Sequence, residues 1–142
     1  MLPAIAILDT PLDTAALRLA AHDPAAGAVV VFEGTARDHH QGRAVDRLAY
    51  EAFGPMAEAE LGKLREQAMA TFGLARCYIH HRTGEVPLME AAVVVAVSSA
   101  HRQESFLAAA WIMDRIKERV PIWKKEQYQD GDANWVEGEA RR

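Results

Sequence analysis

The stretch AAVVVAVSSAHRQESFLAAAWIMDRIKERVPIWKKEQY, residues 91–128, contains a strand, a long helix and a second extended segment in direct succession. Residues 91–99 are mostly small or β-branched, and this run predicts a buried strand. The helix is expected from about Arg102 to about Arg119, because Pro121 stops it. Residues 122–128 are expected to be extended again.

Further strands are expected before this stretch, at residues 1–8, 27–35, 45–53 and 76–83. The run Val29–Phe32 has four consecutive apolar residues, which is typical of a strand buried on both faces. We expect loops at residues 37–43 and in the connection through Gly84 and Pro87, and a turn at Gly131.

Two more helices are expected. The first begins at about Thr10–Asp13 and ends near His22. The second carries Pro55 in its first turn and apolar residues at near-helical spacing, and Gly73 is expected as its C-terminal cap. Because the helices do not follow every strand, the sequence favours an α+β sandwich of sheet and helices over a doubly wound sheet.

The chain has 142 residues, and this length predicts one compact domain covering residues 1–142. A domain of this size buries about 68–70% of its unfolded surface and needs no disulfide or metal for stability. The single cysteine, Cys77, excludes an internal disulfide and a multi-cysteine zinc site. The apolar run Leu2–Leu8 is too short to span a bilayer and lacks the features of a signal peptide, so a cytoplasmic protein is expected.

The net charge of −4 argues against a general nucleic-acid binder, because binding phosphates requires a basic face. Gly34 stands alone after its strand, without the spacing of a Gly-rich phosphate loop, which removes the main support for a nucleotide-binding fold. A local basic cluster nevertheless exists. Three of the four lysines fall within one short segment: Lys117, Lys124 and Lys125.

Lysines placed near one another are candidates for acid–base or nucleophilic chemistry. Each ammonium group disfavours the charged form of its neighbour, and a neutral amine can carry a proton or attack an electrophile. Alternatively, Lys117 only stabilises the end of its helix, and Lys124 and Lys125 are solvated charges on an edge strand. The spacing alone leaves both interpretations open.

The segment Ser98–Arg102 joins a buried strand to a helix N-terminus, where free backbone N–H groups favour anions. Arg102 in a first helical turn opposes the helix dipole, and a bound anion would relieve this conflict. Pairing of Arg102 with Glu104 or another carboxylate explains the arginine equally well. Arg37, just beyond an apolar strand, is well placed to line a pocket, but it can equally be a surface charge.

The histidine pairs His39–His40 and His80–His81 raise the question of a metal site. Adjacent residues of a strand point to opposite faces, so His80 and His81 cannot readily share one ion. No cysteine or carboxylate spacing supports a site at the other pair, and no metal is expected. Cys77 is expected to be a small buried hydrophobic residue. Core or interface positions are expected for Trp111, Trp123 and Trp135.

A series of segments occurs in an order that resembles the large, catalytic subunit of molybdopterin synthase. The segments are Gly34–Arg37, Tyr50–Phe53 followed by Met56–Ala57, His81–Arg82 with Gly84, Ser98–Arg102, Met113–Asp114 with Lys117, and Pro121–Glu126. The resemblance runs from about Gly27 to about Glu137. Its most specific parts are the SSAHR and P-x-W-K-K-E segments.

This resemblance implies an α+β fold with an α/β-hammerhead-type core and an additional antiparallel β subdomain. It implies a homodimer with a small ubiquitin-like sulfur carrier at each end, which together form a heterotetramer. The carrier's C-terminal Gly-Gly thiocarboxylate enters a pocket and transfers sulfur to cyclic pyranopterin monophosphate, and two transfers form the molybdopterin dithiolene. No cofactor is implied, and no metal, because molybdenum is inserted later in molybdenum cofactor biosynthesis. Neither nucleic acid nor a membrane is an expected partner.

The resemblance also assigns roles to individual residues. Lys117 and Lys124 match the catalytic lysines, which we expect to bind the carrier's terminal carboxylate and to move protons during sulfur transfer. Substrate binding is expected from the two lysines together with Arg37, His101 and Arg102, with a contribution across the dimer interface.

Asp38 departs from the resemblance, because many relatives carry asparagine near this position. A carboxylate beside an anion pocket is unfavourable unless it points away. Two other functions are compatible with the sequence. One is a non-catalytic subunit that keeps only the fold and the carrier interface. The other is an unrelated acyl- or phosphate-transfer enzyme that uses the same lysines and turns over without a thiocarboxylated partner.

Overall fold

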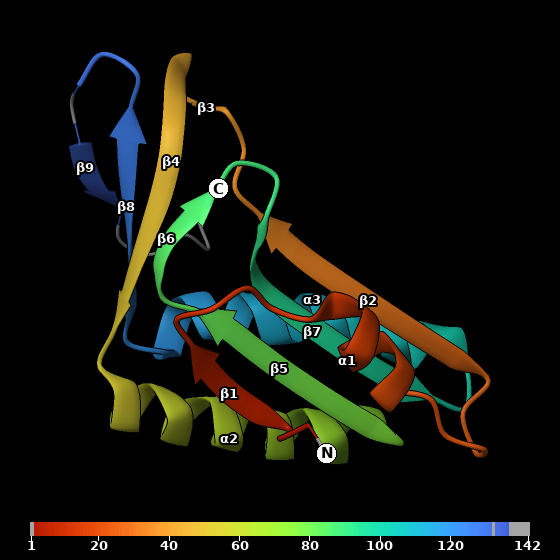
Figure 1. Ribbon diagram of the computed structural model, residues 1–142. Coiled ribbons are helices and arrows are strands. Elements are labelled where there is room, and N and C mark those ends of the chain that lie inside the picture. The colour runs from red at the N-terminus through yellow and green to blue at the C-terminus, as the bar shows by residue number, and fades with distance from the viewer. Residues whose placement is uncertain (1, 132, 137–142) are drawn as a thin grey trace.

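The computed structural model describes residues 2–131 and 133–136 and combines helices with two sheets in an α+β fold (Figure 1). The first sheet lies across the lower part of Figure 1, and the second stands upright beside it. The α+β class and the additional antiparallel sheet expected from the sequence are both confirmed.

The first sheet has the strand order β1-β5-β7-β2, formed by β1 (Ile5–Leu8), β5 (Arg76–Arg82), β7 (Ala91–Ser99) and β2 (Ala28–Thr35). β1 pairs parallel with β5, and the other two pairings are antiparallel. Helices cover both of its faces. One face packs against α2 and α3, and the other packs against α1.

Strand β7 is the centre of the packing, and the expectation of a buried strand at residues 91–99 is confirmed. Val93, Val95 and Val97 belong to the core that α2 and α3 cover, whereas Val94 and Ala96 pack with residues of α1 on the opposite face. Successive side chains of a strand point to opposite faces. A strand covered on both sides therefore needs apolar residues at consecutive positions.

Strand β2 is an edge strand, and the expectation that Val29–Phe32 is buried on both faces holds only in part. Val30 packs against the core beneath α2 and α3, and Val29 and Val31 pack on the α1 side, but all three are only partly buried. β2 pairs with β7 alone among the described strands, and Phe32 keeps 39% of its surface exposed. A continuous apolar run favours a strand but does not say whether another strand lies on each side of it. That depends on the rest of the chain.

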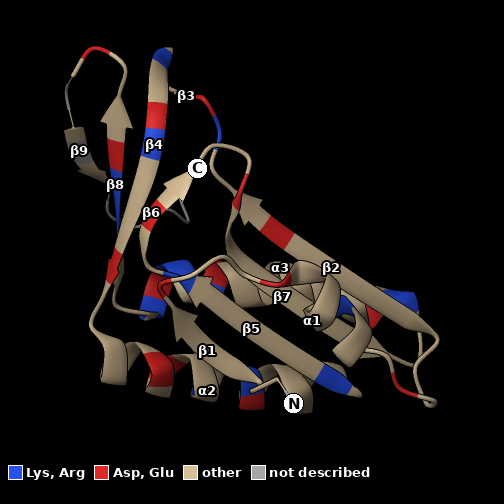
Figure 2. Cartoon of the chain, in the orientation of Figure 1, with Lys and Arg blue, Asp and Glu red and all other residues tan. Residues whose placement is uncertain are grey.

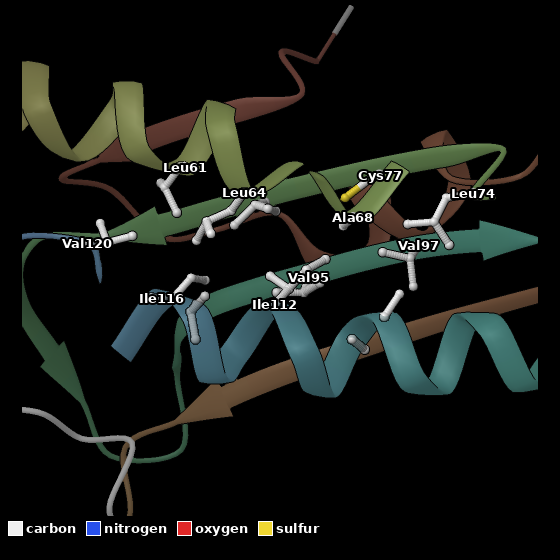
Figure 3. Packing of buried hydrophobic residues seen from close by; sticks show 14 of the residues in the cluster. Leu61, Leu64, Ala68, Leu74, Cys77, Val95, Val97, Ile112, Ile116 and Val120 are labelled. Carbon is white, nitrogen blue, oxygen red and sulfur yellow. The ribbon is translucent and has the colours of Figure 1, made fainter. Parts of the chain in front are cut away.

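The helices α2 (Gly54–Phe72) and α3 (Arg102–Arg119) begin and end close to where the sequence predicts. Figure 3 shows Leu61 and Leu64 of α2 facing Ile112 of α3 over the sheet, and all three side chains are fully buried. Gly73 caps α2 with a φ of 61°, a left-handed conformation that glycine adopts without steric cost. No helix in the described ranges is long and apolar enough to cross a membrane.

The short helix α1 (Thr14–Ala20) starts at a side-chain cap. Asp13 accepts a hydrogen bond from the backbone N–H of Ala16 at 3.0 Å, which satisfies one of the free donors at the helix start. The helix ends at Ala20, slightly before the position expected from the sequence.

The antiparallel arm is the second sheet, formed by β3 (His39–His40), β4 (Arg43–Ala52), β6 (Gly84–Pro87), β8 (Ile122–Tyr128) and β9 (Ala133–Val136). β4 is its longest strand and pairs with β3, β6 and β8. The loop expected through Gly84 and Pro87 is therefore wrong, because these residues form β6. The loop expected at residues 37–43 likewise contains β3. Both strands are too short to show a periodic pattern in the sequence.

Candidate active site

A cavity of about 340 Å³ lies where the antiparallel arm meets the end of α3 and the first sheet. This volume is within the range of small-molecule binding sites. The elements that line it, β2, β4, β5, β7, α3 and β8, are far apart in the sequence. Its lining residues are Phe32, Gly34, Thr35, Arg37, Leu48, Tyr50, His81, Val93, Met113, Ile116, Lys117, Ile122, Lys124 and Glu126.

The cavity brings together Lys117 and Lys124, the two lysines singled out in the sequence. Lys117 is in the last turn of α3 and is half-buried, and Lys124 is near the start of β8 and only 8% exposed. Pro121 separates the two elements, so that the chain leaves the helix and returns along the cavity wall. Basic residues accordingly mark both the end of α3 and β8 (Figure 2).

The alternation of side chains along β8 decides which of its charged residues belong to the site. Lys124, Glu126 and Tyr128 are buried on one face of the strand. Lys125 lies on the other face, with its Nζ 5.6 Å from the centre of the Trp135 ring. Lys125 is therefore excluded from the cavity, although it is adjacent to Lys124 in the sequence.

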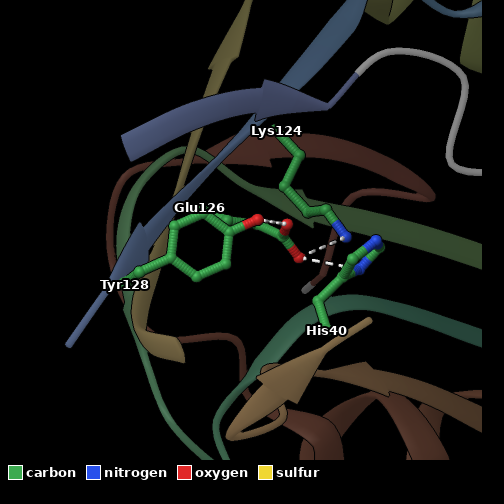
Figure 4. A network of polar contacts seen from close by, with 4 residues as sticks. All are labelled: His40, Lys124, Glu126 and Tyr128. Atoms are coloured by element: carbon green, nitrogen blue, oxygen red, sulfur yellow. Dashed lines mark hydrogen bonds and ion pairs between the residues drawn. The ribbon is translucent and has the colours of Figure 1, made fainter. Parts of the chain in front are cut away.

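Glu126 has a buried carboxylate that three side chains approach (Figure 4). Tyr128 donates a hydrogen bond from its hydroxyl to Glu126 Oε1 at 2.7 Å. The other oxygen, Oε2, lies 3.0 Å from His40 Nδ1 and 3.8 Å from Lys124 Nζ. A buried carboxylate requires such partners, because burial without them is strongly unfavourable.

Arg37 and Gly34 also line the cavity, from the end of β2 and the residues that follow it. A Cβ atom at Gly34 would come within 2.7 Å of Val93 Cγ1, so glycine is needed for the close approach of β2 to β7. Asp38 is exposed and does not line the cavity. Its hydrogen bond with His39, 2.9 Å away, lowers the pKa of the carboxyl, so Asp38 carries its charge outside the lining of the cavity.

His81 is a cavity residue whose role the sequence did not indicate. Burial lowers the pKa of His81 to about 4, so the ring is neutral at physiological pH. Its Nδ1 lies 2.9 Å from the carbonyl oxygen of Arg82. Only a protonated nitrogen can donate to a carbonyl, which leaves Nε2 as an acceptor. The ring of Tyr50 packs edge-on against it, with 5.1 Å between the ring centres.

His101 and Arg102 lie away from this cavity. They line a second, more open depression with Gly27, Ala100, Gln103, Phe106 and Leu107. The α-helical rise of about 1.5 Å per residue places Arg102 about 22 Å from Lys117 along α3. Arg102 is exposed and has no ion pair within the described ranges, so the alternative of a pairing with Glu104 or another carboxylate is not observed. Within one chain, His101 and Arg102 therefore remain separate from Lys117 and Lys124.

The remaining candidate residues, His80 and Cys77, do not line the cavity. His80 is buried and contacts the carbonyl oxygen of Pro3 at 2.8 Å, on the opposite side of β5 from His81. Cys77 is fully buried, as expected, and burial raises the pKa of its thiol to about 12. Among the described residues, no group of three or more His, Cys, Asp or Glu side chains is arranged to hold a metal.

The tryptophans differ from one another. Trp111 packs edge-on against Phe72 at the margin of the core, with 6.0 Å between the ring centres. Trp123 and Trp135 are 42% and 53% exposed, so neither lies in the core. A position in an interface stays a prediction for both.

Comparison with protein families gives one match that covers most of the chain. Residues 7–119 match the family described as MoaE protein. A relative from Emericella nidulans, named molybdopterin synthase catalytic subunit, is 43% identical over 118 residues, which is 83% of this chain and 60% of that relative. A Pyrococcus abyssi protein of the same name is 42% identical over 113 residues, which is 80% of this chain and 76% of the relative.

Solved structures have the same fold. The crystal structure of a molybdopterin synthase from Staphylococcus aureus superposes with a TM-score of 0.89 at 35% identity, covering 96% of this chain and 98% of that one. A Burkholderia ambifaria structure named molybdopterin biosynthesis MoaE protein superposes with a TM-score of 0.77 at 30% identity, covering 99% of this chain and 93% of that one. The chain spans less than two thirds of the length of the fungal relatives.

Proposed function

This chain belongs to the MoaE protein family, and we propose that it is the catalytic subunit of a molybdopterin synthase. In this proposal a small ubiquitin-like carrier presents a C-terminal Gly-Gly thiocarboxylate to the cavity. Its sulfur passes to cyclic pyranopterin monophosphate, and two transfers form the dithiolene of molybdopterin. The observation that carries the proposal is the cavity lined by both Lys117 and Lys124.

The charge of the cavity supports an anionic ligand. Arg37, Lys117 and Lys124 provide three cationic side chains against the single carboxylate of Glu126. The chain as a whole carries a net charge of −4, so this positive group is a local feature. A thiocarboxylate and a phosphate are both anions, and cations in a partly desolvated pocket stabilise them more strongly than in water.

The chemistry requires groups that hold an anion and move protons. When sulfur leaves the acyl carbon of the thiocarboxylate, an oxygen from water must replace it, and the carrier ends as an ordinary carboxylate. Each transfer therefore needs a proton acceptor for water and a proton donor for the pterin. Lysine amines can serve in both ways if their protons exchange readily. We assign the anion binding and the proton transfer to Lys117 and Lys124 together.

Arg37 is assigned to the pterin as a guanidinium that binds its phosphate. We retain His101 and Arg102 as substrate-binding residues supplied by a second copy of the chain. Support for this assignment is the α3 N-terminus at which they lie, because free backbone N–H groups there favour anions. The proposed assembly is a homodimer of this chain with one carrier at each end. A cytoplasmic location and a single domain covering residues 1–142 are part of the same proposal.

The decisive experiment mixes the purified chain with a thiocarboxylated carrier and cyclic pyranopterin monophosphate and measures formation of the dithiolene. Product that depends on all three components is expected. Lys117→Ala and Lys124→Ala should each lower turnover by at least about a hundredfold, in the range for loss of acid–base and electrostatic catalysis. Folding and carrier binding should persist in Lys117→Ala, whereas Lys124→Ala removes a partner of the buried Glu126 carboxylate, so its turnover is compared per folded molecule.

Lys63→Ala is the matched control, because Lys63 is an exposed helix lysine that pairs only with Glu60 at 3.3 Å among the described residues. Its turnover should equal that of the unaltered chain. Normal turnover of Lys117→Ala would overturn its catalytic role. Carrier binding without product in the unaltered chain would favour a non-catalytic scaffold, and product without the carrier would favour an unrelated transferase.

A further inference from the structure

His40 stands out because its imidazole is buried beside a proposed catalytic lysine without an obvious structural task. It is 5% exposed, and its Nδ1 is one of the buried polar atoms that make no aligned hydrogen bond within the described part of the chain. The same nitrogen nevertheless lies 3.0 Å from Glu126 Oε2, which is an ion-pair distance. Buried polar atoms of this kind are uncommon and call for an explanation.

The local structure directs His40 inward. Residues 39 and 40 form β3, which pairs with Arg43 and Ala44 of β4 across the turn at Gln41 and Gly42. Alternation along this short strand leaves His39 exposed and turns His40 into the arm. Figure 4 shows the ring facing the carboxylate of Glu126 and the amine of Lys124.

One oxygen atom serves both positive groups. Glu126 Oε2 is 3.0 Å from His40 and 3.8 Å from Lys124, while the hydroxyl of Tyr128 occupies Oε1. A protonated His40 compensates most of the carboxylate charge at the shorter distance and weakens the hold of Glu126 on the ammonium of Lys124. When His40 is neutral, the carboxylate of Glu126 interacts more strongly with the ammonium of Lys124. His40 and Lys124 are therefore coupled electrostatically through Glu126.

We propose that His40 is a positioning residue for Lys124, which acts through the shared carboxylate of Glu126 to orient the amine and to set how readily it releases its proton. This inference rests on the proposed function for its catalytic consequence. The coupling itself is a property of the chain alone.

The other charged groups near His40 have their own partners. On β8 the facing groups are Glu126, Lys124 and the hydroxyl of Tyr128. On β4, Arg43 lies 3.6 Å above the Tyr128 ring and pairs with Asp130 at 2.8 Å. On its own segment, His39 pairs with Asp38 at 2.9 Å. The charged groups that lie against the His40 ring are therefore Glu126 and Lys124.

The test compares three variants. His40→Asn places an amide nitrogen close to the position of Nδ1 and keeps a donor without a titrating charge, whereas His40→Ala removes the donor. His39→Asn changes the exposed neighbour and serves as the matched control. With the carrier and the pterin supplied, His40→Ala should lower kcat at least about tenfold with KM changed by less than about twofold. His40→Asn should recover kcat to within about threefold, and His39→Asn should match the unaltered chain.

The second readout needs neither carrier nor substrate. Acetylation of Lys124 is followed by mass spectrometry from pH 5.5 to 9, with Lys63 as an internal exposed lysine. The unaltered chain and His39→Asn should show the same pH profile of the relative reactivity of Lys124. The profile of His40→Asn should differ from theirs.

The kinetic and the labelling readouts separate the inference about His40 from the proposed function. Superimposable labelling profiles for the unaltered chain and His40→Asn would overturn the inference, whether or not the protein forms product. A kcat equal to that of the unaltered chain in all three variants would also overturn the inference, while leaving the proposed function intact. A labelling profile that differs between the unaltered chain and His40→Asn, in a chain that makes no product, would support the coupling and count against the proposed function.

Discussion

The helix-covered sheet and the antiparallel arm bury different kinds of group. The core beneath α2 and α3 is made of apolar side chains and Cys77, and the buried arginine of this sheet, Arg82, lies at the end of β5, where it pairs with Glu90 at 2.7 Å. The arm has a smaller apolar cluster, and it contains the buried charged groups His40, Lys124 and Glu126. Burial of hydrocarbon stabilises a fold, whereas burial of charge costs free energy unless each group is paired. We infer that the first region supplies most of the stability and that the second supplies the chemistry.

The cavity lies at the junction of the helix-covered sheet and the arm, and each region contributes one of the two lysines. Lys117 comes from the end of α3, which the core holds rigidly, and Lys124 comes from β8 of the arm. Binding sites need groups held within a fraction of an ångström, and a packed helix provides that precision. The predictions below test this division, from the largest expected effect to the smallest.

The first prediction concerns the core under the helices. Leu64→Ala should lower the free energy of unfolding by about 2–5 kcal/mol, because Leu64 is fully buried and the truncation leaves a cavity. Urea unfolding measures the loss. Turnover per folded molecule should be nearly unchanged, since Leu64 does not line the site. Leu19→Ala, at a residue 63% exposed, is the control. A loss below about 1 kcal/mol would contradict the assignment of stability to this core.

The second prediction is a pH dependence at the junction. Burial lowers the pKa of His81 to about 4 in the folded state, from 6.5 in the unfolded chain. Between these values the unfolded state binds a proton that the folded state does not, so stability falls as the pH drops from about 6.5 to about 4. The full difference is about 3 kcal/mol.

Unfolding curves at pH 7, 5.5 and 4.5 measure this dependence. His81→Asn keeps a donor for the Arg82 carbonyl and should show a shallower pH dependence than the unaltered chain. His22→Asn, at an exposed histidine, should leave the slope unchanged. An unchanged slope in His81→Asn would show that other groups control the acid sensitivity.

The third prediction concerns the apolar cluster of the arm. Val86→Ala should cost about 1–2 kcal/mol, because Val86 is fully buried but only two methyl groups are lost. Turnover should fall more than in Leu64→Ala, since β6 supports β4 in the wall of the cavity. Urea unfolding and the synthase assay provide the comparison. A loss of stability as large as that of Leu64→Ala would break the proposed division between the two regions.

The smallest effect is expected on the exposed surface of α2. Lys63→Gln removes the ion pair with Glu60, in which the Lys63 side chain is 70% exposed. Such pairs are screened by water and salt, so stability should change by less than about 0.5 kcal/mol. Thermal unfolding at low and high salt checks this. A larger loss would mean that surface charge contributes to the stability that we assign to the core.

Much of the secondary structure could be predicted from the sequence. The strand at residues 91–99 and the helix at residues 102–119 have the predicted positions, and Gly73 caps α2 as expected. Each of these depends on a local signal: an unbroken apolar run, a proline after the helix, or a residue that tolerates positive φ. The short strand β6 has no such signal, because its four residues are extended only through pairing with β4.

The site was predicted in part. The lysines at 117 and 124 were singled out, and the alternation along residues 124–128 would also have placed Glu126 and Tyr128 beside Lys124. His81 belongs to one of the segments that carry the resemblance, but nothing in the sequence assigns it a role, and no pattern connects His40 to these residues. The roles assigned to His101, Arg102 and the lysines stay predictions until the variants are measured.

The sequence by itself determined the helices, the longer strands and the family, because helical period, proline and glycine breakers, and the SSAHR and P-x-W-K-K-E segments are properties of neighbouring residues. Only the tertiary structure decided that β2 is an edge strand, that Lys125 leaves the site, and that His40 meets Glu126. These features depend on pairings between distant parts of the chain, such as β4 with β8. A short stretch of sequence specifies its own conformation, but the partner of a strand and the neutrality of a buried histidine are set by what the rest of the fold places around them.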